Sequence, residues 1–331
     1  MQNEKVIIIG AGPCGMACAI ELKKIGIDPL IIEKENVVNT IYRFPTHQTF
    51  FSSSDRLEIG DVPFITENKK PVRNQALAYY REVARRKELR MHTFERVTKV
   101  ERVGQSFQLH TEQTVNKKKK QYMADYVIFA TGYYDQPNYM DIPGEDLPKV
   151  SHYFKEAHPY YDKDVVVIGG KNSAVDATLE LSKAGARVTV LYRGDTYSKS
   201  IKPWILPEFK SLIRNGYVTM HFNATVDKIE EEEVYFTVNG EQHRIKNDFV
   251  FAMTGYQPDL PFLASAGIEI DSKSGKPSYD ENTYETNIPN IYVAGVVAAG
   301  YDNNKIFIEN GRFHGDAIAA SIARKEAKAK V

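Results

Sequence analysis

The sequence predicts an α/β fold made from two copies of one unit: a strand, a glycine-rich turn, a helix and a second strand. The first copy spans residues 6–33 and the second spans residues 165–193. Two later apolar strands end in Thr-Gly, and a third ends in Ala-Gly. Strands that alternate with helices in this way form parallel sheets with helices on their faces.

The first copy reads VIIIGAGPCGMACAIELKKIGIDPLIIEK. Val6–Ile9 is apolar without a break, as expected of a parallel strand that is buried on both faces. We expect the following helix to end at Gly26, since glycine favours the C-terminal cap. A second strand is predicted over Pro29–Ile32, and Glu33 follows it.

The glycines of this copy have the spacing of a dinucleotide-binding loop. Gly10 permits the sharp turn, Gly12 lets the backbone approach a pyrophosphate, and Gly15 lets the helix pack on the strand. The helix N-terminus presents N–H groups to the phosphates. Glu33 lies 23 residues after Gly10, the position from which a carboxylate binds a ribose 2′-OH. We therefore predict a dinucleotide site here.

The second copy repeats the unit with a different residue at its end. Strand Val165–Ile168 leads into a glycine turn and a helix to Gly185, and strand Arg187–Leu191 follows. Arg193 lies 24 residues after Gly169, where the first copy has an acid. An arginine there suits a 2′-phosphate, so the second nucleotide is predicted to be NADPH rather than NADH. Lys171 replaces the middle glycine and either points to solvent or adds charge beside the pyrophosphate.

The later strand ends complete a pattern that resembles a known class of flavoprotein. They read Ala130-Thr131-Gly132, Thr254-Gly255 and Ala294-Gly295, and residues 305–327 are predicted to form a final helix. In the two-dinucleotide-binding flavoproteins of the thioredoxin reductase type, the first unit and the C-terminal segment bind FAD, and the second unit is an inserted NADPH-binding domain. The resemblance implies two Rossmann-like domains: an FAD-binding domain of residues 1–140 and 260–331, and an NADPH-binding domain of residues 141–259.

The same resemblance gives candidate cofactor-binding residues. For FAD they are Gly10, Gly12, Pro13, Gly15, Glu33, Lys34, Gln48, Thr131, Gly132 and Gly295. For NADPH they are Gly169, Gly170, Lys171, Asn172, Ser173, Ala174 and Arg193. Residues 40–49 approach the flavin ring in this fold, which adds Thr40, His47 and Thr49; His47 is either a proton donor or a surface histidine.

One feature of these flavoproteins is missing. Their late strand usually ends in Gly-Asp, whose carboxylate holds the ribityl chain of the flavin. Here Val296 follows Gly295, and Asp302 and Asn303 are the candidates to replace that contact.

The chain has only two cysteines, Cys14 and Cys18. Cys14 lies in the first turn of the predicted helix, where the positive end of the helix dipole is expected to lower the pKa of a thiol and make it nucleophilic. Alternatively, Cys14 fills a small-residue position beside the pyrophosphate. Cys18 is expected to pack as a small apolar residue, and an i,i+4 pair on a helix does not suit a disulfide. A Cys-x-x-Cys pair is absent, which excludes a thioredoxin reductase proper.

Four stretches resemble the bacillithiol-disulfide reductases, FAD- and NADPH-dependent flavoproteins of low-GC Gram-positive bacteria. The stretches are GAGPCGMACAIEL, THQTFFSSSDRLEIGDVPF, IGGKNSAVDATLEL and ENGRFHGDAIA. That family carries a lone cysteine in its first glycine loop, at the position of Cys14. The resemblance implies that Cys14 attacks oxidised bacillithiol and that the reduced flavin then cleaves the mixed disulfide, which requires the sulfur to approach the flavin ring.

Three other functions stay open. A ferredoxin/flavodoxin–NADP reductase of the same fold passes electrons to a protein partner and needs no cysteine. A flavin monooxygenase shares the paired units, although its linker histidine does not fit His152, which is eight residues after Gly144. A flavin-bound redox sensor would turn over little NADPH.

Composition limits the class of protein. The 43 basic and 43 acidic residues cancel, so a nucleic-acid partner is not expected. The runs Lys117–Lys120 and Glu230–Glu233 each lie between β-like segments and are predicted to be solvated hairpin turns. We expect no membrane span and no signal peptide, and the two cysteines indicate a reducing compartment, the cytoplasm. Relatives of this type are commonly homo-oligomers.

Overall fold

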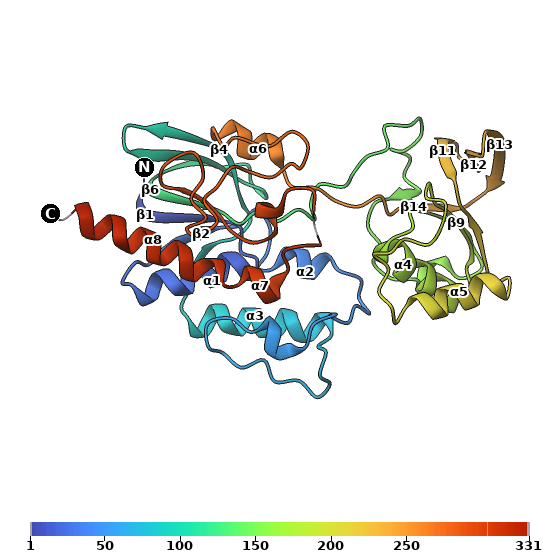
Figure 1. The fold of residues 1–331 in the computed structure, drawn as a ribbon, viewed down its shortest axis with the longest axis horizontal. Helices are drawn as coiled ribbons and strands as arrows, with labels where there is room; N and C mark the ends of the chain where they lie inside the picture. Colours follow the sequence, from blue (N-terminus) through green and yellow to red (C-terminus); the bar gives the residue numbers. More distant parts are fainter. Residues whose placement is uncertain (1, 303, 330–331) are drawn as a thin grey trace. The chain divides into compact units, whose positions relative to one another are not determined.

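The computed structural model describes residues 2–302 and 304–329, which divide into two compact units. Unit 1 takes the chain up to Gln136 and again from Gln257, and unit 2 is Pro137–Tyr256 (Figure 1). Each unit is built on a sheet with helices, so the predicted α/β class is confirmed. No helix in the described ranges is long and apolar enough to cross a membrane.

The sheet of unit 1 has seven strands in the order β3-β2-β1-β6-β5-β4, and β15 pairs with β6 beside this path. The long strand β6 pairs antiparallel with β5 along its first half and parallel with β15 at its end. β1, β2, β3, β6 and β15 are mutually parallel. The strands are β1 (Gln2–Ile9), β2 (Leu30–Ile32), β3 (Arg90–His92), β4 (Glu95–Val103), β5 (Ser106–Gln113), β6 (Lys119–Phe129) and β15 (Ile291–Val293).

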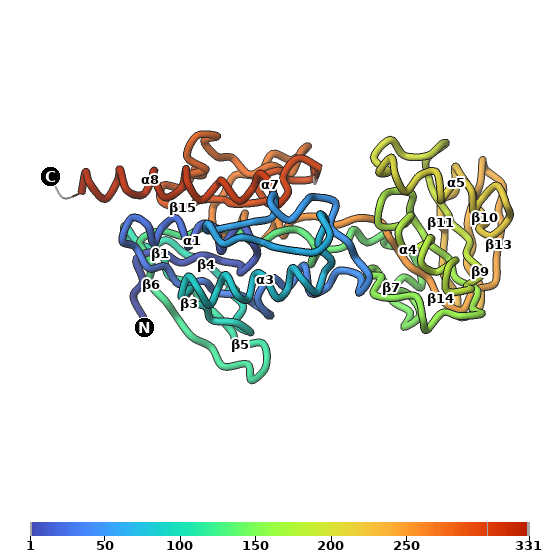
Figure 2. Tube along the Cα trace, turned by 90° about the horizontal axis from the view of Figure 1, so that it is seen from below, coloured from blue at the N-terminus to red at the C-terminus, as the bar shows by residue number. Residues whose placement is uncertain are grey.

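Both faces of this sheet are covered, which explains the unbroken apolar run of β1. Val6 and Ile8 pack in one cluster with residues of α1, α3 and α8, whereas Ile7 and Ile9 pack in another with residues of β4, β5 and α6. In Figure 2, α8 and β5 lie on opposite sides of unit 1. The helical segments are α1 (Pro13–Lys24), α2 (Asn39–Arg43), η1 (Ser54–Leu57), α3 (Arg73–Arg86), α6 (Leu260–Ser265), η3 (Gly295–Ala299), α7 (Ile308–Gly311) and α8 (His314–Ala329).

The single helix predicted over residues 305–327 is wrong in its first part, because the segment forms the short α7 and the longer α8. Phe307 has extended backbone angles, and its N–H donates to the Asn310 side chain at 2.7 Å. Such a local bond competes with helical hydrogen bonding and starts a new turn. The break between the two helices follows Gly311, which lies against α1.

Unit 2 contains a five-stranded parallel sheet in the order β10-β9-β8-β14-β7 and a separate antiparallel sheet of β11, β12 and β13. The predicted strand Arg187–Leu191 is β9, and Glu230 and Glu233 join in the β11–β12 turn, as predicted. The elements are β7 (Val150–Ser151), η2 (His158–Tyr160), β8 (Asp164–Ile168), α4 (Asn172–Lys183), β9 (Arg187–Leu191), α5 (Leu206–Arg214), β10 (Val218–His221), β11 (Ala224–Ile229), β12 (Glu233–Val238), β13 (Glu241–Lys246) and β14 (Phe249–Ala252).

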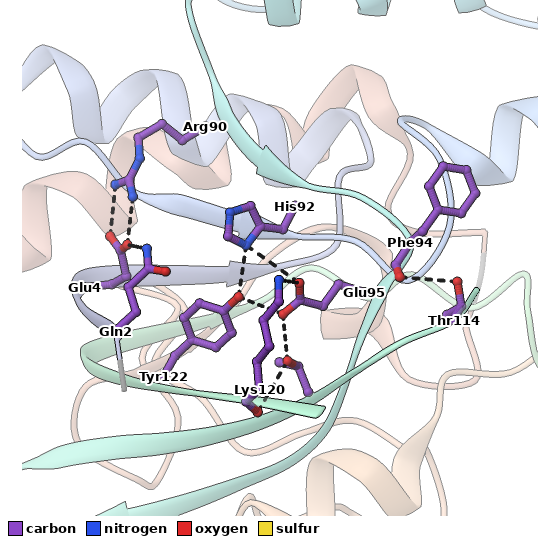
Figure 3. A network of polar contacts seen from close by, with 10 residues as sticks. Gln2, Glu4, Arg90, His92, Phe94, Glu95, Thr114, Lys120 and Tyr122 are labelled. Carbon is purple, nitrogen blue, oxygen red and sulfur yellow. Dashed lines mark hydrogen bonds and ion pairs between the residues drawn. The ribbon is translucent and has the colours of Figure 1, made fainter. Parts of the chain in front are cut away.

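The lysine run between β5 and β6 is only partly a solvated turn. Lys117 lies in the turn with φ +61, as predicted, but Lys120 belongs to β6. The Lys120 Nζ donates at 2.7 Å to the carboxylate of Glu95, whose side chain is 1% exposed (Figure 3). Thr111 and Tyr122 donate to the same carboxylate at 2.6 and 2.7 Å. The antiparallel register brings Lys120 opposite Thr111, and this pairing was not visible in the sequence.

Candidate functional site

The carboxyl ends of four parallel strands of unit 1 meet at one edge of the sheet. The first glycine loop follows β1, Glu33 follows β2, Thr131 lies after β6, and Gly295 follows β15. These segments touch, since Gly10 approaches Ala130 and Gly295 approaches Cys14. Ligands of open α/β sheets bind at such an edge.

The glycine loop has the geometry that its spacing predicts. Gly10 has φ +111, and a Cβ atom there would lie 2.4 Å from the carbonyl oxygen of Ala130. A Cβ atom on Gly15 would lie 2.2 Å from the carbonyl oxygen of Gly10, so only glycine lets α1 pack this closely. At Gly12 a Cβ atom would meet no protein atom within 4 Å. The loop is therefore tight towards the sheet and open on its outer side.

Glu33 is 8% exposed and braces this loop from inside. Its carboxylate accepts the N–H of Ala11 at 2.8 Å and the N–H of Glu35 at 2.9 Å. Burial raises the pKa of Glu33, and the two backbone donors oppose that rise. The Glu33 carbonyl oxygen accepts the N–H of Glu95 at 2.9 Å, which links the loop to the Glu95 network of Figure 3.

Two buried polar atoms beside the loop lack a partner within the described residues: Thr131 Oγ1 and Asn39 Nδ2. Asn39 begins α2 next to the loop, because the N–H of Val38 donates to the carbonyl oxygen of Ala11. The first-turn N–H groups of α1 also have no acceptor within the helix. Unsatisfied buried donors and acceptors are costly, so these atoms fit the polar phosphate and ribityl groups of FAD.

Cys14 lies at this edge, but its thiol is not in the environment that its helix position predicts. Part of the residue is exposed. However, its Sγ faces backbone: a Cβ atom on Gly295 would lie 3.1 Å from the sulfur, and one on Gly311 would lie 2.9 Å away. Burial raises the pKa of Cys14 to about 12. The expectation of a lowered pKa is therefore wrong, because burial disfavours the charged thiolate.

Cys18 is fully buried in the core of unit 1, as predicted, and the two cysteines are not bonded to each other. It lies against α8, where a Cβ atom on Gly315 would come within 3.0 Å of the Cys18 backbone. Gly311 and Gly315 thus contact Cys14 and Cys18, residues one turn apart on α1.

The remaining candidates for FAD contact differ in their exposure and in their polar partners. Lys34 pairs with Asp135 at 2.9 Å, and the Gln48 side chain donates to the carbonyl oxygen of Thr49 at 2.8 Å. His47 is exposed in the segment after α2. Asp302 is exposed and its N–H donates to the carbonyl oxygen of Ala299, and Asn303 lies outside the described residues.

The second glycine loop follows β8 in unit 2 and has the same tight geometry. Gly169 has φ +135, and a Cβ atom there would lie 2.5 Å from the carbonyl oxygen of Met253. A Cβ atom on Gly170 would lie 2.4 Å from the Tyr192 ring. The Asn172 side chain donates to the carbonyl oxygen of Ser200 and accepts the N–H of Lys202, both at 2.9 Å.

The charged candidates of this loop are accessible. Lys171 and Arg193 are exposed, as is Ser173, whereas Ala174 is a buried residue of α4. The Asn172 side chain does not point to solvent, because it is hydrogen-bonded to the backbone of Ser200 and Lys202. Exposed cations beside an open helix N-terminus suit a phosphorylated nucleotide.

Sequence reasoning gave His314 no role, yet it is buried and bonded to Gly295, the residue that contacts Cys14. Its Nδ1 accepts the N–H of Gly295 at 3.1 Å, and its ring stacks on Tyr284 with centroids 4.0 Å apart. A histidine between two glycines of a helical stretch carries no distinctive pattern. The tandem Gly311 and Gly315, four residues apart, was the signal of close helix packing that could have drawn attention to this segment.

Comparisons with known proteins agree with this arrangement. Residues 7–295 match the model of the pyridine nucleotide-disulphide oxidoreductase family. The chain is 64% identical over 329 residues to a bacilliredoxin reductase of Bacillus subtilis (strain 168), covering 98% of this chain and 99% of that protein.

Solved structures show the same similarity. The bacillithiol disulfide reductase of Bacillus cereus superposes with a TM-score of 0.97 at 65% identity, covering 98% of this chain and 100% of that chain. The Staphylococcus aureus enzyme of that name gives a TM-score of 0.94 at 57% identity, with the same coverage. A ferredoxin–NADP reductase of Ignicoccus hospitalis is more distant, at 25% identity over 300 residues, 87% of this chain and 88% of that protein.

Proposed function

The chain belongs to the pyridine nucleotide-disulphide oxidoreductase family, and from that membership we propose that it reduces bacillithiol disulfide with electrons from NADPH. It is an FAD- and NAD(P)H-dependent disulfide reductase. The observation that carries the substrate is the identity of 65% over nearly the whole chain with a bacillithiol disulfide reductase of Bacillus cereus.

The glycine loop of each unit indicates which cofactor that unit binds. We propose that unit 1 holds FAD, with the α1 N-terminus and Gly12 at the pyrophosphate and Thr131 and Asn39 at its polar groups. Unit 2 holds NADPH at Gly169–Ala174, with Arg193 at the 2′-phosphate. When bound, FAD accepts a hydride from the nicotinamide and supplies two electrons for disulfide cleavage.

Cys14 is the group we propose to carry the substrate half of the reaction. Its thiolate attacks one sulfur of the disulfide, the S–S bond breaks, and the leaving thiolate takes a proton to become the first thiol product. Cys14 then holds the second half as a mixed disulfide. Two electrons and one further proton release that half as the second thiol and restore the Cys14 thiolate.

Because Cys14 is buried, the reaction requires that its thiol first lose a proton. With a pKa of about 12, the thiol is protonated at neutral pH, whereas only the thiolate attacks a disulfide. Cys14 is nevertheless the better placed of the two thiols, because it is partly exposed at the sheet edge and Cys18 is fully buried. We infer that access to the thiolate limits the substrate half-reaction.

A protein disulfide is the second candidate substrate, because the Bacillus subtilis relative is named a bacilliredoxin reductase. Both substrates present the same S–S bond to Cys14, and they differ in the surface that must dock. Transfer to a ferredoxin is less favoured, since the relative of that activity shares only 25% identity. We further propose that the enzyme works in the cytoplasm as a homo-oligomer.

The test compares NADPH consumption by the FAD-loaded wild type, Cys14→Ala and Cys18→Ala, with bacillithiol disulfide and with an oxidised bacilliredoxin as separate substrates. We expect disulfide-dependent turnover in the wild type and in Cys18→Ala. In Cys14→Ala it should fall by at least about 100-fold, because the covalent route is lost. Unchanged turnover in Cys14→Ala would refute the role of Cys14. If the wild type turns over neither bacillithiol disulfide nor oxidised bacilliredoxin, the proposed function is refuted.

A further inference from the structure

His314 connects the start of α8 to the turn that covers Cys14. It is the first residue of α8 and is 5% exposed. Its Nδ1 lies 3.1 Å from the backbone nitrogen of Gly295. The ring stacks on Tyr284 with an interplanar angle of 19°, so the imidazole is held from one face and at one nitrogen.

The direction of this hydrogen bond fixes the state of the imidazole. A backbone N–H can only donate, so Nδ1 accepts and the ring proton lies on Nε2. Burial lowers the pKa of His314 to about 4, which keeps the ring neutral at physiological pH. A neutral acceptor at this position leaves the Gly295 N–H satisfied in a buried turn.

Gly295 is at the same time a wall of the Cys14 environment. It has φ +77, and a Cβ atom there would lie 3.0 Å from Cβ and 3.1 Å from Sγ of Cys14. Gly311, three residues before His314, faces the same sulfur. The contacts therefore run from His314 through Gly295 to Cys14, and Gly311 of α7 contacts the same sulfur.

We propose that His314 is a positioning residue whose neutral imidazole fixes the Gly295 turn against Cys14 and so sets how far the thiol is shielded from solvent. The inference rests on the proposed reaction of Cys14 for its importance. Its test reads the chemical reactivity of the thiol rather than turnover, so either proposal can fail without the other.

The experiment measures the rate of alkylation of Cys14 by iodoacetamide at pH 8 in the FAD-loaded protein, followed on the Cys14 peptide by mass spectrometry. His314→Asn and His314→Leu form a matched pair, because the two side chains have similar shape and only Asn offers an acceptor at the place of Nδ1. His314→Phe keeps a ring on Tyr284 and removes the acceptor. The flavin absorbance spectrum and the melting temperature check that each variant is folded and loaded.

Loss of the acceptor is expected to speed alkylation about tenfold in the Leu and Phe variants, the effect of one buried hydrogen bond. The Asn variant should stay within about threefold of the wild type, since it keeps that bond. If His314 merely fills the core, the alkylation rates should differ in another way: the Phe variant should be close to the wild type, and the Asn variant should be as fast as the Leu variant. Either result would overturn the proposal. If the Phe variant does not fold, the Asn–Leu comparison decides alone.

Discussion

The sulfur of Cys14 and the backbone of Gly311 are in contact, so that a Cβ atom on Gly311 would lie 2.9 Å from Sγ. Cys14 is the second residue of α1 and Gly311 is the last residue of α7. One helical turn further along, Cys18 and Gly315 repeat the arrangement, and α1 and α8 pack side by side (Figure 1). The environment of the thiol is thus part of how the C-terminal segment closes unit 1.

Gly311→Ala should destabilise the protein by about 1–3 kcal/mol, because the added methyl overpacks the Cys14 sulfur. In a helix without this contact, the same change would be stabilising. Urea unfolding of the wild type, Gly311→Ala, Cys14→Ala and the double variant measures the coupling. We expect Gly311→Ala to lower the free energy of unfolding clearly less in the Cys14→Ala background than in the wild type. Additive effects would show that the two residues do not share this contact.

The alkylation rate of Cys14 in the wild type should rise about tenfold per pH unit between pH 7 and pH 10, because the thiolate fraction rises in that way below the pKa. A pKa of about 12 leaves no plateau in this range. The profile is the rate of Cys14 labelling by iodoacetamide at each pH in the FAD-loaded protein. The labelling rate of glutathione, measured under the same conditions, is the reference for an accessible thiol. A rate that levels off near pH 7 would instead mark an activated, low-pKa cysteine.

Glu95→Gln should destabilise unit 1 by about 1–2 kcal/mol, because it removes the charge from a buried hydrogen-bonded carboxylate, whereas the partly exposed Lys120 ammonium stays hydrated. Burial opposes ionisation of Glu95, but bonds from Lys120, Thr111 and Tyr122 outweigh it and lower its pKa. The stabilisation is therefore present above the ordinary carboxyl pKa of 4.5 and is lost as the pH falls through the folded pKa.

Chemical denaturation at pH 7 and pH 4 checks both parts of that prediction. Glu101→Gln is the matched control, since Glu101 lies on the same strand with a side chain that is 40% exposed. Its effect on the free energy of unfolding should stay within about 0.5 kcal/mol. Equal losses in the two variants would contradict a special role of the buried network.

Arg193→Ala should raise the KM for NADPH by about 10- to 100-fold and leave the KM for NADH unchanged, because only NADPH carries the 2′-phosphate. The reductive half-reaction, followed as bleaching of the flavin absorbance under anaerobic conditions, measures this without any disulfide. Lys171→Ala is the comparison: a similar loss with both nucleotides would assign that lysine to the pyrophosphate. Parallel losses with both nucleotides in Arg193→Ala would remove Arg193 from the 2′-phosphate site.

Much of the fold could be predicted because its requirements are local. Gly10 and Gly169 must adopt positive φ at the end of an apolar strand, and glycine spacing reveals that. Val6–Ile9 is apolar throughout because both faces of β1 are covered, which a continuous run also reveals. The charged turn at Glu230–Glu233 is local in the same sense. The late start of α7 was missed, since it depends on the bond that the Phe307 N–H donates to the Asn310 side chain.

The sequence by itself determined that this chain carries two nucleotide loops and a cysteine in the first of them. The tertiary structure alone decided what surrounds that cysteine. The pKa of a thiol depends on the atoms that replace its water, and those around Cys14 come from Gly295 and Gly311, at the other end of the chain. The pairing of Lys120 with Glu95 and of His314 with Gly295 was hidden for the same reason: burial and long-range contact are properties of the packed molecule.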